Sequence, residues 1–233
     1  LFKNLSPLDI EQSIQAFEEE IRASQILMLP GGITGGDEPT GSAKFFVNLL
    51  KNDRIREAVE DLLQNRDGLI LGIGNGFQAL LKTGLLPFGA YTDFAENRSA
   101  LTANTIGRHV AQMVYTRVTS VKSPWFALVN AGDVFALPVS HGEGRFTAPE
   151  DVLRGLSANG QIAAQYVDLN GSPAGALSFN PNGSVCAVEA VTSPDGRILG
   201  KMGHSERPCD GLYKNVPFEK NQKIFEAGVK YFK

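Results

Sequence analysis

The stretch that decides the fold is GLILGIGNGFQALLKTG, residues 68–84. Residues 68–73 form a short apolar run, which is typical of a buried strand in a parallel sheet. The run stops at the glycine-rich turn 74–76, and residues 77–83 then read as a helix that ends at Gly84. A strand, a glycine-rich turn and a helix are the unit of an α/β sheet, whose ligands bind at the carboxyl ends of the strands.

A similar pattern precedes this stretch. Ser6 is a candidate N-cap for a helix with Pro7 at its first position, and apolar residues follow at helical spacing up to Ile21. Residues 25–29 then predict another buried strand, followed by a glycine-rich loop at 30–41. Because both glycine-rich loops follow strands, we expect them to converge at one edge of the sheet. A helix that leads into a strand also predicts an earlier strand upstream, so we expect the chain to be a fragment of a longer one.

The rest of the chain adds helices and further strands. Two helices are expected at residues 42–52 and 54–64. Further strands are expected at residues 108–119, 134–140, 161–167, 187–193 and 198–203. The segment SPDGR, residues 193–197, predicts the turn of a hairpin, because Asp-Gly tolerates positive φ. A C-terminal helix carries one apolar stripe that we expect to pack on the sheet, formed by Ile224, Phe225, Gly228, Val229 and Phe232.

These elements predict one domain over residues 1–233, of the α/β class. We expect an open, mostly parallel sheet flanked by helices, with an antiparallel section in the second half. The net charge is −3 and no polybasic run occurs, which argues against a nucleic-acid partner. No apolar stretch approaches the ~20 residues that span a bilayer, and no signal pattern opens the sequence, so we expect a soluble cytoplasmic protein without a membrane partner. Cys186 and Cys209 are too few for a disulfide scaffold and lack zinc-site spacing, so we expect no metal site and interpret both cysteines as structural or incidental.

The turn GIGNG, residues 72–76, has three interpretations. A dinucleotide-binding fingerprint, GxGxxG, would need glycine where Phe77 stands. A nucleophile elbow, GxNuxG, holds a reactive residue on a strained turn between two glycines, and Gly74 occupies that central position. A tight turn without chemistry is the third interpretation. The sequence disfavours the first and leaves the other two open.

Three other segments carry candidate site residues. The loop PGGITGGD, residues 30–37, either brings backbone N–H groups to a ligand oxygen, as in an oxyanion hole, or simply connects two elements. His204 and Glu206 are two residues apart at the end of the last expected strand, so an extended backbone would point both to one side. The carboxylate would then orient the imidazole, with a surface ion pair as the alternative. SHGEG, residues 140–144, also follows a strand, so His141 is a candidate ligand-contacting residue or an ordinary loop histidine.

Eight segments in order along nearly the whole chain carry a family resemblance. They are LPGGITGGDEPTGSAKFF from residue 29, LGIGNGFQALLKTGLLP from 71, LTANTIGRHV from 101, SPWFALVNAGD from 123, LPVSHGEGRF from 137, YVDLNG from 166, FNPNGS from 179 and GHSERP from 203. Together they resemble the class I glutamine amidotransferases, whose fold is flavodoxin-like. More narrowly, they are similar to the C-terminal glutaminase domain of the large form of phosphoribosylformylglycinamidine synthase. SHGEGRF and FNPNGS separate this family from other amidotransferases, and GHSE stands where many members have PHPE.

The resemblance implies the roles of particular residues. The family's catalytic triad is cysteine, histidine and glutamate, and by motif the last two fall on His204 and Glu206. The cysteine, in a motif of the form GxCNGxQ, falls on Gly74, which implies a chain deficient in glutaminase activity. Oxyanion or glutamine-binding positions carry over to Gly31, Gly32, Asn75, Gln78, Ser140 and His141.

The resemblance also implies a division of labour. In the family, the glutaminase domain releases ammonia from glutamine through a cysteine-bound thioester. A separate synthetase domain, where ATP and Mg are expected, uses that ammonia to convert formylglycinamide ribonucleotide into the amidine in purine biosynthesis. We therefore expect glutamine and the synthetase domain of the same synthase as partners, and no cofactor in this domain. A non-catalytic glutamine-binding or scaffolding module is the alternative.

Overall fold

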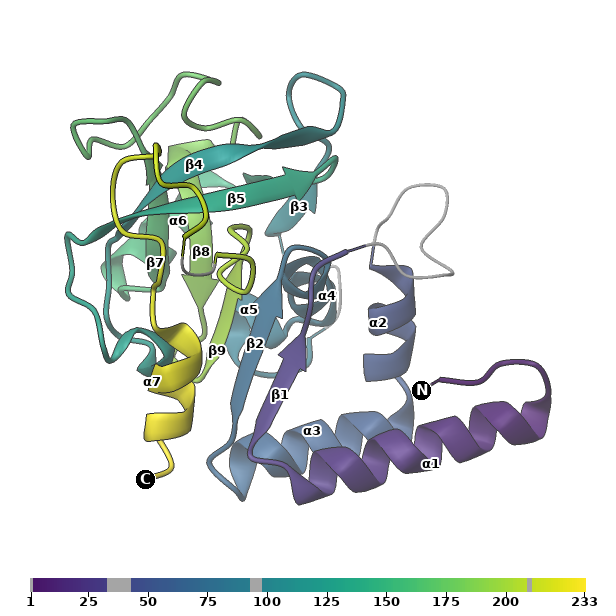
Figure 1. Cartoon of the computed structure of the whole chain (residues 1–233). Helices are drawn as coiled ribbons and strands as arrows, with labels where there is room; N and C mark the ends of the chain where they lie inside the picture. The colour runs from purple at the N-terminus through teal and green to yellow at the C-terminus, as the bar shows by residue number, and fades with distance from the viewer. Residues whose placement is uncertain (1, 33–42, 93–97, 209–210) are drawn as a thin grey trace.

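The computed structural model describes residues 2–32, 43–92, 98–208 and 211–233 (Figure 1). Within these ranges a seven-stranded sheet has the order β1-β2-β9-β8-β7-β4-β5, and β3 pairs with β6 in a second, two-stranded sheet. The strands are β1 Ile26–Leu29, β2 Leu69–Ile73, β3 Ala100–Thr102, β4 Val110–Val118, β5 Val134–His141, β6 Arg145–Thr147, β7 Ile162–Val167, β8 Val188–Thr192 and β9 Ile198–Lys201. The helices are α1 Pro7–Ala23, α2 Lys44–Leu50, α3 Asp53–Gln64, α4 Asn75–Thr83, α5 Leu85–Phe88, α6 Glu150–Ala158 and α7 Ile224–Lys230, with short 3₁₀ turns η1 Pro124–Phe126 and η2 Val185–Ala187.

The α/β class, the flanking helices and the antiparallel section in the second half are confirmed. Strands β1, β2 and β9 pair in parallel, whereas β9 with β8, β8 with β7, β7 with β4 and β4 with β5 are antiparallel. It follows that β1, β2, β9, β7 and β5 run in one direction, and β8 and β4 in the other. The tight turn at residues 193–197 joins antiparallel β8 and β9 and has Gly196 at φ 85°, as predicted.

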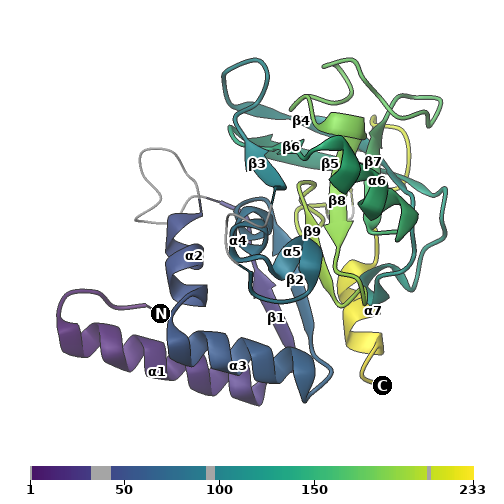
Figure 2. The same cartoon turned by 180° about the vertical axis from the view of Figure 1, so that it is seen from behind.

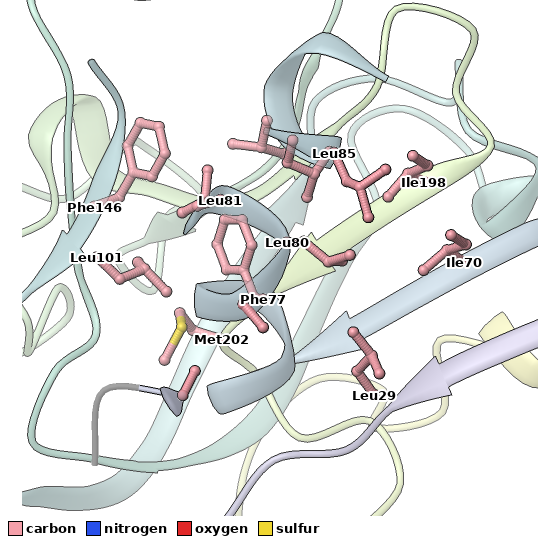
Figure 3. Close-up of a cluster of buried hydrophobic side chains, with 14 of the residues drawn as sticks. Leu29, Ile70, Phe77, Leu80, Leu81, Leu85, Leu101, Phe146, Ile198 and Met202 are labelled. Atoms are coloured by element: carbon pink, nitrogen blue, oxygen red, sulfur yellow. The ribbon is translucent and has the colours of Figure 1, made fainter. Parts of the chain in front are cut away.

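Helices cover both faces of the sheet, which explains the continuous apolar run of β2. Figures 1 and 2 show α4, α5 and α6 on one side and α7 on the other. Ile70 packs in the larger core with α4, while Leu69 and Leu71 pack in the second core with Trp125. Figure 3 shows Ile70 close to the side chains of α4, including Leu80.

The C-terminal helix differs in part from the expected stripe. Ile224 and Gly228 are buried, and a Cβ on Gly228 would lie 2.5 Å from the Trp125 indole. Val229 and Phe232 are 48% and 37% exposed, so their assignment to the packed stripe is wrong. The reason is that α7 is short and packs through one narrow face on η1, and Phe232 lies beyond its end.

Two boundaries bear on the site. The last strand ends at Lys201 rather than at residue 203. Of the helix expected at 42–52, the structure has Lys44–Leu50, and residue 42 lies outside the described ranges. Strand β1 lies at one edge of the sheet, and the expected upstream strand, which is not part of this sequence, stays a prediction. In the described part of the chain, none of the helices has the length and apolar character needed to cross a membrane.

Candidate functional site

Gly74 forms the turn between β2 and α4, with φ 53° and ψ −108°. The positive φ agrees with the elbow interpretation, in which the central residue adopts a strained conformation. The N–H of Gly74 donates to the carbonyl oxygen of Lys201 at 2.8 Å, and its own carbonyl accepts from the N–H of Gln78 at 3.1 Å. The turn is therefore fixed to the end of β9 on one side and to the first turn of α4 on the other.

His204 lies beside this turn, on the segment that follows β9. Its Nδ1 is 2.5 Å from Oε1 of Glu206, and its backbone N–H donates to the carbonyl of Pro138 at 2.9 Å. A Cβ placed on Gly74 would lie 3.9 Å from Nε2 of His204, in ordinary van der Waals contact. The imidazole therefore faces the Gly74 position with its Cε1–Nε2 edge, both atoms at 3.9 Å, while Glu206 holds Nδ1.

The pairing of His204 with Glu206 does not arise from an extended strand, and that expectation is wrong. The strand ends at Lys201, and the following residues form a turn in which the N–H of Ser205 donates to Gly203 and the N–H of Arg207 to His204. Because the backbone turns after the end of β9, the turn, rather than the alternation of side chains along a strand, brings His204 and Glu206 together.

The environment favours a charged carboxylate at Glu206. Partial burial raises the pKa of Glu206. The hydrogen bond to His204, a backbone hydrogen bond, and the charges of His204 and Lys201 together lower this pKa by more than burial raises it. The net result is a Glu206 pKa below its usual value. The His204 side chain is almost fully buried and the Glu206 side chain is 37% exposed, and their hydrogen bond lets the carboxylate act as an anionic partner for the imidazole.

The loop after β1 converges on the same place, as expected. The Cα of Gly31 is 3.6 Å from the Cβ position of Gly74. A Cβ on Gly31 would lie 2.6 Å from Cε1 of His204 and 3.3 Å from the carbonyl oxygen of Ile73, so only glycine fits beside the imidazole. Gly32 follows with φ 109° and is exposed. Residues 33–37 of the expected oxyanion loop lie outside the described residues.

The side chains of the other expected binding residues do not all point to the space between Gly74 and His204. Asn75 opens α4 directly after Gly74. Gln78 is buried and donates from Nε2 to Oε2 of Glu143 at 2.7 Å. The hydroxyl of Ser140 is 3.1 Å from Nε2 of His109, an exposed residue, so the Ser140 side chain faces away from the buried side of β5.

His141, the next residue on β5, is buried on the side of His204. Burial, with a smaller contribution from the nearby charges of His204 and His109, lowers the pKa of His141 from 6.5 to about 4. Neither ring nitrogen has a hydrogen-bond partner among the described residues. His141 is therefore a neutral imidazole at pH 7, with both ring nitrogens buried.

Sequence reasoning missed a group of buried charged residues behind the turn. Lys201 ends β9 and Glu189 lies in β8, both with fully buried side chains. The available signal was a charged residue within each of two otherwise uncharged strands, ILGK and VEAVT. Burial lowers the pKa of Lys201, although the charges of Glu189 and Glu206 oppose this.

An α/β sheet with a positive-φ turn after one strand and a histidine–carboxylate pair after its parallel neighbour fits the arrangement expected of a glutamine amidotransferase domain. The comparison of families agrees: residues 8–232 match the CobB/CobQ-like glutamine amidotransferase domain, and this chain belongs to that family.

Its relatives are similar over most of their length. Phosphoribosylformylglycinamidine synthase subunit PurQ of Methanococcus maripaludis is 35% identical over 226 residues, covering 89% of this chain and 80% of the relative. The PurQ subunit of Aquifex aeolicus is 32% identical over 195 residues, covering 84% of this chain and 78% of the relative.

Solved structures show the same fold. A chain in the structure of PurLQS from Thermotoga maritima superposes with a TM-score of 0.64 at 25% identity, covering 90% of this chain and 80% of that chain. The glutaminase domain of Trypanosoma brucei CTPS with bound acivicin has a TM-score of 0.50 at 16% identity, covering 99% and 80%. The second likeness is one of fold alone.

Proposed function

We propose that this chain is a glutaminase domain of a phosphoribosylformylglycinamidine synthase in which glycine occupies the nucleophile position. It would bind glutamine without hydrolysing it. One observation carries the proposal: the Cβ position of Gly74 lies 3.9 Å from Nε2 of His204, whose Nδ1 is 2.5 Å from Glu206. The glutamine amidotransferase family and the PurQ relatives support the choice of substrate and of synthase.

The chemistry that a cysteine at position 74 would perform follows from this geometry. Nε2 of His204 would take the thiol proton, and Sγ would attack the side-chain amide carbon of glutamine. The same proton would pass to the departing nitrogen, which leaves as ammonia, and water would then release glutamate from the thioester. Glycine provides no nucleophile, and loss of a covalent nucleophile commonly costs on the order of 10⁶-fold in turnover.

We assign the oxyanion donors to backbone N–H groups. Gly31 and Gly32 approach the Gly74 position from the loop after β1, and Asn75 is the first residue of α4. N–H groups at such a turn and helix start would stabilise the negative oxygen of the tetrahedral intermediate. This assignment uses the backbone alone, so it does not require particular side chains at these positions.

We further propose that His141 and Gln78 shape the glutamine pocket. His141 offers a neutral imidazole close to His204, and the amide of Gln78 fixes the carboxylate of Glu143 at 2.7 Å. Ser140 stays a prediction without support from its side-chain contacts, because its hydroxyl faces His109.

The partner in this proposal is the synthetase part of the same synthase, which would receive the ammonia and hold ATP and Mg. The PurLQS structure supports a partner of that kind, since a chain similar to this one occurs in it. A non-catalytic glutamine-binding or scaffolding module is the second candidate. Gly74 itself favours it, because the chain carries no thiol at the centre of the site.

Glutamate release tests the proposal. The chain and its Gly74→Cys variant would each be assayed with glutamine in the complete synthase, with Gly74→Cys/His204→Ala as the control. We expect glutamate from Gly74→Cys alone. If Gly74→Cys releases no more glutamate than the unsubstituted chain, the site is not a glutaminase centre and the binding-module function replaces it.

A further inference from the structure

Lys201 and Glu189 hold the peptide that precedes His204. The two side chains are fully buried, with Nζ of Lys201 3.4 Å from Oε1 of Glu189. Oε1 of Glu189 accepts the N–H of Gly203 at 2.6 Å, and Nζ of Lys201 donates to the carbonyl of Gly203 at 2.7 Å. The pair therefore binds both backbone polar groups of the residue next to the imidazole.

The same network holds the residue that follows His204. Nζ of Lys201 donates to Oγ of Ser205 at 2.9 Å, and that hydroxyl donates to Oε1 of Gln222 at 2.7 Å. Gln222 lies just before α7, in a segment remote from the strands in sequence. Both neighbours of His204 are thus held by side chains. Lys201 and Glu189 bind Gly203, and Lys201 and Gln222 bind the hydroxyl of Ser205.

The residue types at these two positions match the network. A Cβ on Gly203 would lie 2.9 Å from Oε1 of Glu189 and 3.0 Å from Nζ of Lys201, so a side chain there would displace the two charged groups. Proline at 203 would lack the N–H that Glu189 accepts, and proline at 205 would lack the hydroxyl between Lys201 and Gln222. The sequence GHSE is the form of this turn that the network can hold.

Stability alone does not explain a fully buried ion pair. Removing two charges from water is costly, and apolar residues of similar volume often serve stability equally well. The hydrogen bonds of Lys201 and Glu189 go to residues of the turn, Gly203 and Ser205.

We propose that Lys201 and Glu189 are positioning residues, which fix the turn so that His204 meets Glu206 and faces Gly74. Only the statement that this arrangement is catalytic rests on the proposed function. The geometric part concerns the chain as it is, so it can be tested without glutaminase activity.

Two sets of variants test it. Lys201→Met/Glu189→Leu removes both charges together, so that neither is left buried without its partner. Ser205→Ala removes only the hydroxyl, and Ser205→Thr keeps a hydroxyl at the same position. If the double variant does not fold, the Ser205 pair still decides the question.

The first readout is the NMR signal of the His204 Nδ1 proton in this chain, which a 2.5 Å hydrogen bond to a carboxylate shifts far downfield. We expect that signal to move upfield or broaden in the double variant and in Ser205→Ala, and to persist in Ser205→Thr. A role in stability alone would lower the denaturation midpoint and leave the signal of the folded chain unchanged.

The second readout is glutaminase activity in the complete synthase carrying Gly74→Cys. We expect the double variant to lower kcat by roughly 10- to 100-fold with little change in KM, because a misplaced base affects chemistry more than binding. The proposal is overturned if the folded double variant keeps the downfield signal or, where the double variant does not fold, if Ser205→Ala keeps it. If Gly74→Cys is inactive, the proposed function fails while the NMR result still decides the positioning role.

Discussion

The Cβ position of Gly74 lies 3.9 Å from Nε2 of His204, and the two residues follow adjacent parallel strands. The hydrogen bond from the N–H of Gly74 to the carbonyl of Lys201 joins the ends of β2 and β9. Adjacent parallel strands end side by side, so residues that follow them meet at one edge of the sheet. The sheet topology therefore produces this approach between segments that are far apart in the sequence.

A side chain at position 74 should cost stability. The φ of 53° and ψ of −108° strain any residue with a Cβ, by about 1–3 kcal/mol. We expect Gly74→Ala and Gly74→Cys to lower the free energy of unfolding by similar amounts of that size, measured by urea denaturation. Gly175→Ala is the control, because its Cβ would meet nothing within 4 Å. Equal stability of Gly74→Ala and the unsubstituted chain would show that the turn is not strained.

A methyl group on Gly31 should displace the imidazole. Its Cβ would lie 2.6 Å from Cε1 of His204, so the ring or the loop must move. In the Gly74→Cys background we expect Gly31→Ala to lower kcat by about 100-fold, since displacements of about 1 Å have effects of this order. Glutamate release by Gly74→Cys/Gly31→Ala would be compared with Gly74→Cys/Gly175→Ala. Undiminished activity would mean that the loop does not contact the base.

His141 should make the fold sensitive to acid. Its pKa is lowered from 6.5 to about 4 in the folded chain, so between these values the unfolded chain binds the proton more tightly. The contribution of His141 to stability is full above pH 6.5, declines as the pH falls to about 4, and is constant below that. A shift of this size corresponds to about 3 kcal/mol.

His141→Gln removes this ionisation, so we expect its free energy of unfolding to fall less than that of the unsubstituted chain between pH 7 and pH 4. Urea denaturation across that range measures the difference. His109→Gln removes an exposed histidine and is the matched control. Parallel pH profiles for the chain and His141→Gln would contradict the burial argument.

The sequence alone predicted the elements whose patterns are local. The apolar run of β2, the turn at Gly74, the N-cap at Ser6 and the Asp-Gly hairpin each depend on neighbouring residues. The Ser6 hydroxyl accepts the N–H of Asp9 at 3.2 Å, as its capping pattern indicated. Such signals are readable because backbone conformation responds to the adjacent side chains.

The parts that sequence missed depend on tertiary packing. The turn after β9 takes its shape from Lys201 and Glu189, and no local pattern shows that these charges meet. Helical spacing puts Val229 on the same side of α7 as Phe225. How much of that side is buried depends on its packing against η1, and Val229 is exposed. Ser140 follows a motif, while its side-chain direction depends on the strand pairing with β4.

The most direct test of the proposed nucleophile position is covalent labelling of Gly74→Cys with an electrophilic analogue of glutamine, such as its chloroketone. Intact mass and peptide mapping would locate the adduct, and Cys186, an exposed thiol, is an internal control. We expect one adduct at residue 74, none on the unsubstituted chain, and loss of labelling in Gly74→Cys/His204→Ala and with excess glutamine. An unlabelled Gly74→Cys variant, or labelling unaffected by His204→Ala and glutamine, would contradict the account.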